Sequence, residues 1–242
     1  MLKGGEHLDR FRCTVEIIEP QLGTVPKDPN VYAAFIKKRA EELGIDNTHG
    51  ELDEELETIE TVEEKGWTGF HKDDKGPFVL NYMVKGQIKC ALETLIEVGA
   101  IPKIKAYRKW ADRMIHVYPR RIYFHRNGVN LAGTGKVLER PLRVMTPKGE
   151  RVTVARSDTV EPGSRLTYEI CILRNGKHLT VNAVREALDY GWFLGLGQWR
   201  SAGWGNFRVV EWKEVQIPKD WYADPYTYEQ AHGSMVSAPN PN

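Results

Sequence analysis

The spacing of apolar residues along the chain predicts most of its regular elements. Apolar and polar positions alternate in "FRCTVEIIEP", which predicts a strand over 11–20 with Cys13, Val15 and Ile17 on one face. Apolar residues recur with helical spacing in three later segments. These predict helices over 30–44, 79–100 and 180–195, the last with Thr180 as its N-cap.

Strands and turns are predicted in the middle of the chain and near its C-terminal end. Short runs rich in β-branched and aromatic residues fill 101–165, and a closing strand is predicted over 206–215. "RNG" (126–128) and "PKGE" (147–150) are typical of hairpin turns. The glycines, proline and charges of 66–78 predict a loop.

The order of these elements favours an α+β fold. A ferredoxin-like (RRM-like) β-α-β-β-α-β core with insertions accounts for it. We expect one domain over 1–216, with an acidic insertion at about 45–65, followed by an irregular C-terminal tail over 217–242. Gly86 is unusual inside the second helix, where glycine costs about 1 kcal/mol. We therefore expect another backbone to approach it closely.

Composition excludes several classes of protein. The chain of 242 residues has a net charge of +1 and three cysteines, Cys13, Cys90 and Cys171, with no CxxC spacing. The number and spacing of the cysteines argue against a disulfide framework and against a zinc site. The N-terminus is polar, and no apolar window reaches the length of a membrane span. We expect a cytoplasmic protein that uses no metal or cofactor and does not bind a membrane.

The near-neutral total hides a strong charge asymmetry. Residues 101–165 hold fifteen Lys and Arg against five acids, a net +10, and aromatic residues are interleaved with them. Guanidinium groups bind phosphates and aromatic faces stack on bases, which favours a single-stranded nucleic acid. Arginines at alternate strand positions are equally typical of the solvated face of a sheet. The eight acids of 51–64 form either a solvated face or an electrostatic gate against a basic neighbour.

"GWFLGLGQWRSAGWGNFRVVEW" (191–212) combines five glycines with four tryptophans between a helix and a strand. In dinucleotide-binding folds the glycines instead follow a strand and open a helix. The order found here therefore excludes dinucleotide binding by this stretch. Glycine permits positive φ and the close approach of another backbone. A phosphodiester backbone is one such partner.

"GLGQWRSAGWGNFRV" resembles the glycine-rich loop of the RAMP superfamily, the CRISPR-associated, ferredoxin-like RNA-binding proteins. "GPFVLNYMVKGQIKCAL" (76–92) resembles that family's helix entry, with Pro77, Lys85 and Gly86 in comparable places, and "FRCTVEIIEPQLGT" resembles its first strand. The resemblance implies binding of single-stranded RNA, often a guide, with the start of this helix beside the strand, and side-by-side assembly as in backbone-type subunits.

The sequence departs from the family pattern at several positions. Asn81 and Tyr82 stand where the family often has small hydroxyl residues, and Cys90 and Ala91 stand where a basic residue is common. The acidic stretch matches no family pattern.

Together these observations predict a non-catalytic protein that binds single-stranded RNA as a subunit of a CRISPR-type or mobile-element ribonucleoprotein. Its partners would be copies of itself or other subunits. The expected RNA-binding residues are Lys85, Lys89, Arg108, Lys109, Arg120, Arg121, Arg126, Trp199, Arg200 and Trp204. We expect the glycine-rich segment to lie on the sheet surface that carries the arginines.

Two alternatives stay open. The first is a metal-independent endoribonuclease that uses His125 or His71 as a general acid or base. The second is a protein-interaction module that inhibits a defence complex, in which the acidic stretch mimics nucleic acid.

Overall fold

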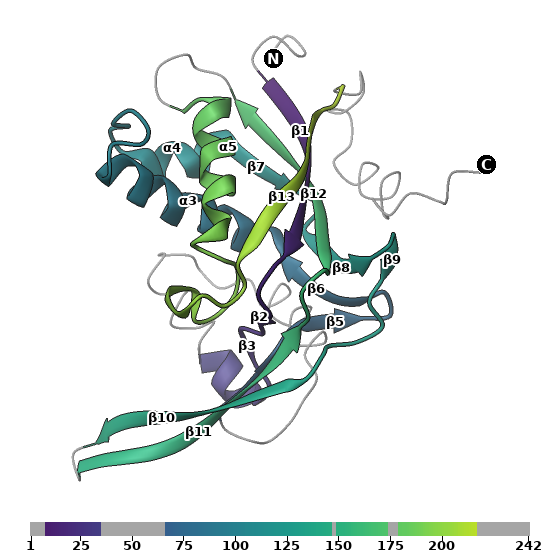
Figure 1. Ribbon diagram of the computed structural model, residues 1–242, viewed down its shortest axis with the longest axis vertical. Coiled ribbons are helices and arrows are strands. Elements are labelled where there is room, and N and C mark those ends of the chain that lie inside the picture. Colours follow the sequence, from purple (N-terminus) through teal and green to yellow (C-terminus); the bar gives the residue numbers. More distant parts are fainter. Residues whose placement is uncertain (1–7, 35–65, 147–148, 174–178, 217–242) are drawn as a thin grey trace.

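The computed structural model describes residues 8–34, 66–146, 149–173 and 179–216 (Figure 1). A large sheet at its centre contains strands β1 (Leu8–Ile17), β5 (His71–Asp73), β6 (Gly76–Leu80), β7 (Ile115–Tyr118), β8 (Arg121–Arg126), β9 (Val129–Asn130), β12 (Arg165–Leu173) and β13 (Phe207–Glu214). The helices are α3 (Asn81–Glu97), α4 (Tyr107–Met114) and α5 (Val181–Asp189), with short 3₁₀ turns at Tyr190–Trp192 and Arg200–Ala202. The main strand order is β13-β1-β12-β8-β6-β5.

The centre of this sheet has the ferredoxin-like arrangement that the sequence predicts. Along the chain the core elements are β1, α3, β7 with its continuation β8, β12, α5 and β13. In the sheet β1 and β12 are the central pair, β13 lies beside β1, and β7 and β8 pair in succession with β12, all antiparallel. This is a β-α-β-β-α-β core with the last strand next to the first.

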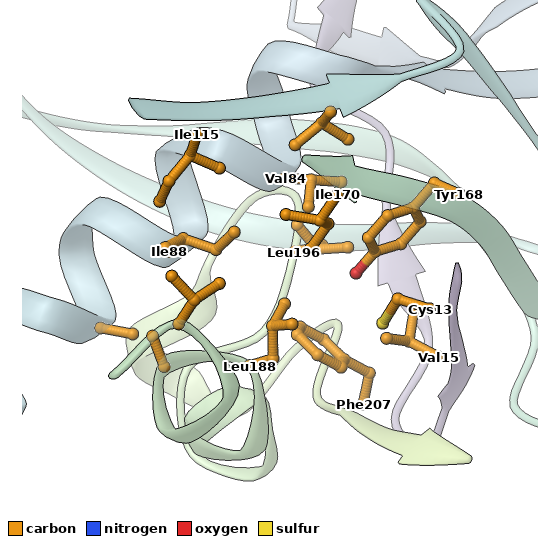
Figure 2. Close-up of a cluster of buried hydrophobic side chains, with 14 of the residues drawn as sticks. Cys13, Val15, Val84, Ile88, Ile115, Tyr168, Ile170, Leu188, Leu196 and Phe207 are labelled. Atoms are coloured by element: carbon orange, nitrogen blue, oxygen red, sulfur yellow. The ribbon is translucent and has the colours of Figure 1, made fainter. Parts of the chain in front are cut away.

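One face of the sheet is covered by α3 and α5 and forms the hydrophobic core (Figure 2). The predicted inward face of β1, Cys13, Val15 and Ile17, is buried there. Figure 2 also shows Val84 and Ile88 of α3, Ile115 of β7, Tyr168 and Ile170 of β12, Leu188 of α5, Leu196 and Phe207. Each large apolar side chain buried in this way contributes about 1.5–3 kcal/mol.

A second sheet carries a long hairpin that extends away from the core (Figure 1). Its strands are β2 (Gln21–Leu22), β3 (Val25–Pro26), β4 (Trp67–Gly69), β10 (Val137–Thr146) and β11 (Gly149–Val160). The hairpin β10–β11 pairs continuously from Val137↔Asp158 to Thr146↔Gly149. At its base the buried ammonium of Lys27 lies 2.8 Å from Asp158 Oδ2, and Trp67 Nε1 donates to Asp158 Oδ1 at 2.8 Å. This buried ion pair fixes the hairpin to the residue that follows β3.

Several local predictions are confirmed. The segment 79–100 contains α3, and α5 begins after Thr180, whose Oγ1 accepts the N–H of Ala183 at 3.1 Å. Asn127 and Gly128 both have positive φ, 50° and 78°, in the turn between β8 and β9. Positive φ at both central residues is the requirement of a tight hairpin turn.

Other local predictions are wrong. The predicted loop 66–78 contains β4, β5 and most of β6, because these short strands are held by partners distant in sequence, such as β8 for β6. Helix α4 was not predicted within 101–165, because its strongly polar segment packs only two buried residues, Ala111 and Met114.

Some predicted segments fall largely outside the described residues. Of the predicted helix over 30–44, the residues up to 34 are described and are helical. The acidic insertion at about 45–65 and the tail 217–242 lie outside the described residues.

The segment 191–205, called the glycine loop below, closes on itself backbone to backbone. A Cβ atom at Gly195 would overlap the carbonyl group of Gly205, and Leu196 N–H donates to Gly205 O at 2.9 Å. The close partner predicted for these glycines is therefore the chain itself. At Gly86 the prediction of a close backbone is wrong, because no described atom lies within 4 Å of a Cβ built there.

We predict opposite effects of two glycine substitutions on stability. Gly195→Ala should lower the free energy of unfolding by about 1–3 kcal/mol, because the methyl group forces the two backbones apart. Gly86→Ala, the matched control, should raise it by about 1 kcal/mol, because helical Ala is favoured over Gly and nothing described is displaced. Urea denaturation measures both. A Gly195→Ala variant as stable as the parent would contradict the close approach.

Candidate nucleic-acid interface

The structure separates the residues expected to bind nucleic acid into three groups. Lys85, Lys89, Arg108 and Lys109 lie on α3 and α4. Arg120, Arg121 and Arg126 lie at β8. Trp199, Arg200 and Trp204 lie in the glycine loop. The expectation that the loop and the arginines share one sheet surface is wrong for Arg121.

The two faces of the sheet account for this separation. On β8, Ile122 and Phe124 point into the core, so Arg121 projects from the opposite face, which no described helix covers. Arg200 reaches the helix-covered side, where its Nη2 lies 4.0 Å from Cys90 Sγ of α3.

Among the cations of α3 and α4, Lys89 and Arg108 are paired with carboxylates. Lys85 and Lys89 share a helix face, as their spacing predicts, and both reach Asp112: Lys85 Nζ donates to the backbone carbonyl at 2.7 Å, and Lys89 Nζ to Oδ1 at 2.9 Å. Arg108 donates to both carboxylate oxygens of Glu93, at 2.7 and 2.8 Å. Because exposed pairs contribute only about 0–1 kcal/mol, these cations remain able to exchange partners.

The arginines at β8 are also engaged. Arg121 Nη1 donates to Asp73 Oδ2 at 3.0 Å, and Arg126 Nη2 donates to Pro162 O at 2.8 Å. The backbone carbonyl of Arg120 accepts Asn81 N–H at 2.9 Å, which places this residue beside the start of α3.

Neither candidate catalytic histidine is presented to solvent. His71 is 2% exposed and stacks on Phe78, with ring centroids 5.6 Å apart. Burial, reinforced by Arg121 and Arg120, lowers its pKa to about 4. The imidazole is therefore neutral at pH 7 and packed as a core side chain.

His125 ends a chain of hydrogen bonds that crosses the uncovered face of the sheet. Glu211 Oε2 accepts from Thr14 Oγ1 at 2.9 Å, Thr14 and Thr167 hydroxyls are 3.0 Å apart, and His125 Nε2 lies 2.9 Å from Thr167 Oγ1. Since the carboxylate only accepts, each hydroxyl donates toward it and His125 Nε2 carries the proton. Burial, with Arg165 second, lowers the pKa of His125. Its Nδ1 is buried, so this group is poorly placed to reach a substrate.

The glycine loop presents Trp199 at its tip. The Trp199 backbone is left-handed, with φ of 57°, and its side chain is 40% exposed. The guanidinium carbon of Arg140, on β10, lies 4.0 Å from the centre of the Trp199 ring, and Arg140 Nη2 donates to Gln198 Oε1 at 2.9 Å. Trp204 is half-buried in the same loop. The loop is thus tied to the base of the hairpin.

Arg140 was not predicted as a site residue. Its contacts with Gln198 and Trp199 join segments 58 positions apart in sequence, and nothing in "VLERPLRVMT" distinguishes it from neighbouring arginines. The sequence does not indicate that strand β10 lies beside the loop.

Arg140 and Arg200 differ from most described arginines in having no carboxylate partner among the described residues. By contrast, Arg165 and Arg208 both pair with Glu16, and these two partners lower the pKa of that carboxyl group. Trp199 therefore has the guanidinium group of Arg140 over its ring and is followed in the chain by Arg200, neither with an acidic partner among the described residues. The described residues contain no cluster of three potential metal ligands.

Comparison with known proteins gives structural likenesses only. No family model and no curated protein matches the chain. It is similar to a chain of the structure titled "Cryo-EM structure of the Type III-B Cmr-beta bound to cognate target RNA", at 11% identity and a TM-score of 0.48. The match covers 87% of this chain and 61% of that one. The fold assignment rests on the strand order and pairing. No described helix is long and apolar enough to cross a membrane.

We predict that His71 makes stability depend on pH. Because its folded pKa of about 4 lies below its ordinary value of 6.5, protonation favours the unfolded chain. The contribution of the neutral, buried ring is complete above about pH 6.5 and is lost progressively as the pH falls toward 4, by about 3 kcal/mol in total. The free energy of unfolding of the parent should therefore fall more over this interval than that of His71→Phe. Parallel urea-derived curves for the two proteins would contradict the burial of a neutral His71.

Proposed function

We propose that this protein binds single-stranded RNA as a non-catalytic subunit of a ribonucleoprotein assembly, and that the glycine loop is the centre of the interface. The proposal is carried by Arg140, which lies over the exposed ring of Trp199, and by Arg200, the next residue in the chain; neither has a carboxylate partner among the described residues. A guanidinium group without an acidic partner is available to a phosphate, and planar donors suit phosphate oxygens.

The proposed interface extends from the loop along α3. Arg200 contacts Cys90, which directly follows Lys89, and Lys85 lies one helical turn earlier. Arg120 lies beside the start of the same helix. Arg108 and Lys109 of α4 and Trp204 of the loop complete the proposed residues. Arg121 and Arg126 do not belong to it, because Arg121 projects from the opposite face and Arg126 is bound to Pro162.

Exposed aromatic rings favour a single strand over a duplex. Besides Trp199, Trp192 is 52% exposed and Phe193 is 69% exposed at the start of the loop. Rings of this kind stack on unpaired bases, whereas the bases of a duplex are already stacked on one another. The interface therefore combines a charged path for phosphates with surfaces for bases.

The assembly is proposed from the RAMP-like motifs of the sequence. In this reading the chain is a CRISPR-type or mobile-element subunit that joins copies of itself or other subunits along the RNA. The buried positions of His71 and His125 favour a binding role over the endoribonuclease alternative.

The proposal predicts a specific salt dependence for Arg200→Gln. The variant should bind a labelled, unstructured single-stranded RNA about tenfold more weakly, since one charge-assisted phosphate contact is lost. The slope of log K against log salt concentration should fall by about 0.7, which corresponds to one phosphate on a single strand. Fluorescence anisotropy at several salt concentrations measures both quantities.

Arg208→Gln is the matched control. It also removes one arginine charge near the loop, but Arg208 is paired with Glu16 and lies on β13, so affinity and slope should stay near those of the parent. The proposed function fails if the parent does not bind the single strand, or prefers a duplex of the same sequence. An Arg200→Gln slope equal to that of the parent would remove the loop from the interface.

A further inference from the structure

Trp199 has a backbone conformation that needs support from its surroundings. Its φ of 57° lies in the left-handed region, which is unfavourable for a bulky residue. Such conformations persist where the neighbouring structure imposes them, and they cluster at binding sites. Here the residue so constrained carries a large ring that is 40% exposed.

Arg140 supplies much of that support from outside the loop. Its guanidinium group lies over the indole ring at 4.0 Å from the centroid, and the same group holds the side chain of the preceding residue, Gln198, through a 2.9 Å hydrogen bond. A planar guanidinium stacked on an indole restricts both rotation and tilt of the ring. The ring position is therefore set by strand β10 as well as by the loop.

This arrangement is poorly explained as a device for stability. Arg140 Nε and Nη1 are buried without a hydrogen-bond partner among the described residues, and burial lowers the pKa of Arg140. The side chain of Gln21, fully buried beneath Gly197, also has both amide atoms unpartnered within the described chain. Native proteins retain few such atoms, and each calls for a reason other than packing.

We propose that Arg140 is a positioning residue that holds the ring of Trp199 as a stacking platform for one unpaired nucleobase, next to a phosphate held by Arg200. This inference rests on the proposed function and assigns its ligand contact. A nucleotide is the occupant because it supplies both an aromatic face for the exposed ring and an anion for Arg200. An apolar protein side chain would cover the ring and leave the nearby guanidinium groups desolvated without a counter-charge.

The test separates base stacking from charge with two probes. One is a labelled single-stranded RNA, and the other is an oligomer of the same length in which the bases are replaced by abasic sites. Trp199→Ala should weaken binding of the RNA by about tenfold without changing the salt slope. Binding of the abasic oligomer should be unchanged. Trp199→Phe, which keeps an aromatic face, should retain most of the affinity.

Arg140→Lys tests the positioning role, because lysine keeps the charge and loses the planar stack. We expect it to weaken binding of the RNA nearly as much as Trp199→Ala does, with the parent salt slope and normal binding of the abasic oligomer. The double variant Arg140→Lys with Trp199→Ala should bind no more weakly than Trp199→Ala, because both changes remove one platform. If Arg140 had a merely structural role, Arg140→Lys would instead weaken binding of both probes.

A second measurement tests the inference even if Trp199→Ala does not fold. Binding of the RNA should quench indole fluorescence in the parent, and Trp199→Phe should remove a distinct part of that quenching. The inference is overturned if Trp199→Ala folds and binds both probes as the parent does, or if Trp199→Phe leaves the quenching unchanged. A salt slope lowered by about 0.7 in Arg140→Gln would also overturn it, because Arg140 would then contact phosphate itself. If the parent binds neither probe, the proposed function fails as well, so the two failures are distinguishable.

Discussion

The glycine loop depends on the contact between the backbones of Gly195 and Gly205. Because neither residue has a Cβ, the two ends of the loop close on each other, and Gly205 N–H then donates to Pro20 O at 3.0 Å. This second bond anchors the closed loop to the segment after β1. Between the two glycines Leu196 enters the core, whereas Trp199 lies at the surface and Arg200 is half-buried. Close packing at the base of the loop therefore produces the exposed group at its tip.

Sequence patterns predicted the fold well where burial is regular. Strand β1 shows alternation, α3 and α5 show helical spacing, and these elements define the ferredoxin-like core. The patterns failed for the short strands within 66–78, where pairing with distant strands determines the conformation and local composition predicts a loop. They also failed for α4, a polar segment in which Ala111 and Met114 are buried and the partly buried Tyr107 and Trp110 pack against the core.

The candidate site was predictable only where local composition indicates it. Trp199 and Arg200 were found because glycine and tryptophan are concentrated in one stretch. Their partner Arg140 was not, since no local feature indicates that β10 reaches the loop. The +10 charge of 101–165 was a poor guide to a binding surface, because charge counts contain no information on pairing. In the structure four arginines of this segment already have acidic partners: Arg108, Arg121, Arg156 and Arg165.

The uncovered face of the sheet illustrates how pairing decides where a ligand can bind. Its hydrogen-bonding groups are connected across four strands, from Glu211 through Thr14 and Thr167 to His125. Arg165 and Arg208 meet on Glu16 of the intervening strand β1. A ligand on this face would have to replace these interactions, and the exchange would return little free energy.

The contacts around Trp199 differ because they are incomplete within the described protein. Arg140 joins the base of the hairpin to the loop and satisfies only part of its own donors, while Arg200 contacts the Cys90 thiol and has no carboxylate partner among the described residues. The hairpin base is meanwhile fixed by the buried pair of Lys27 and Asp158. Two rigid supports thus hold an exposed aromatic ring and its cationic neighbours in one geometry. A ligand that meets this group pays little ordering entropy in the protein, which is the physical advantage of a preformed site.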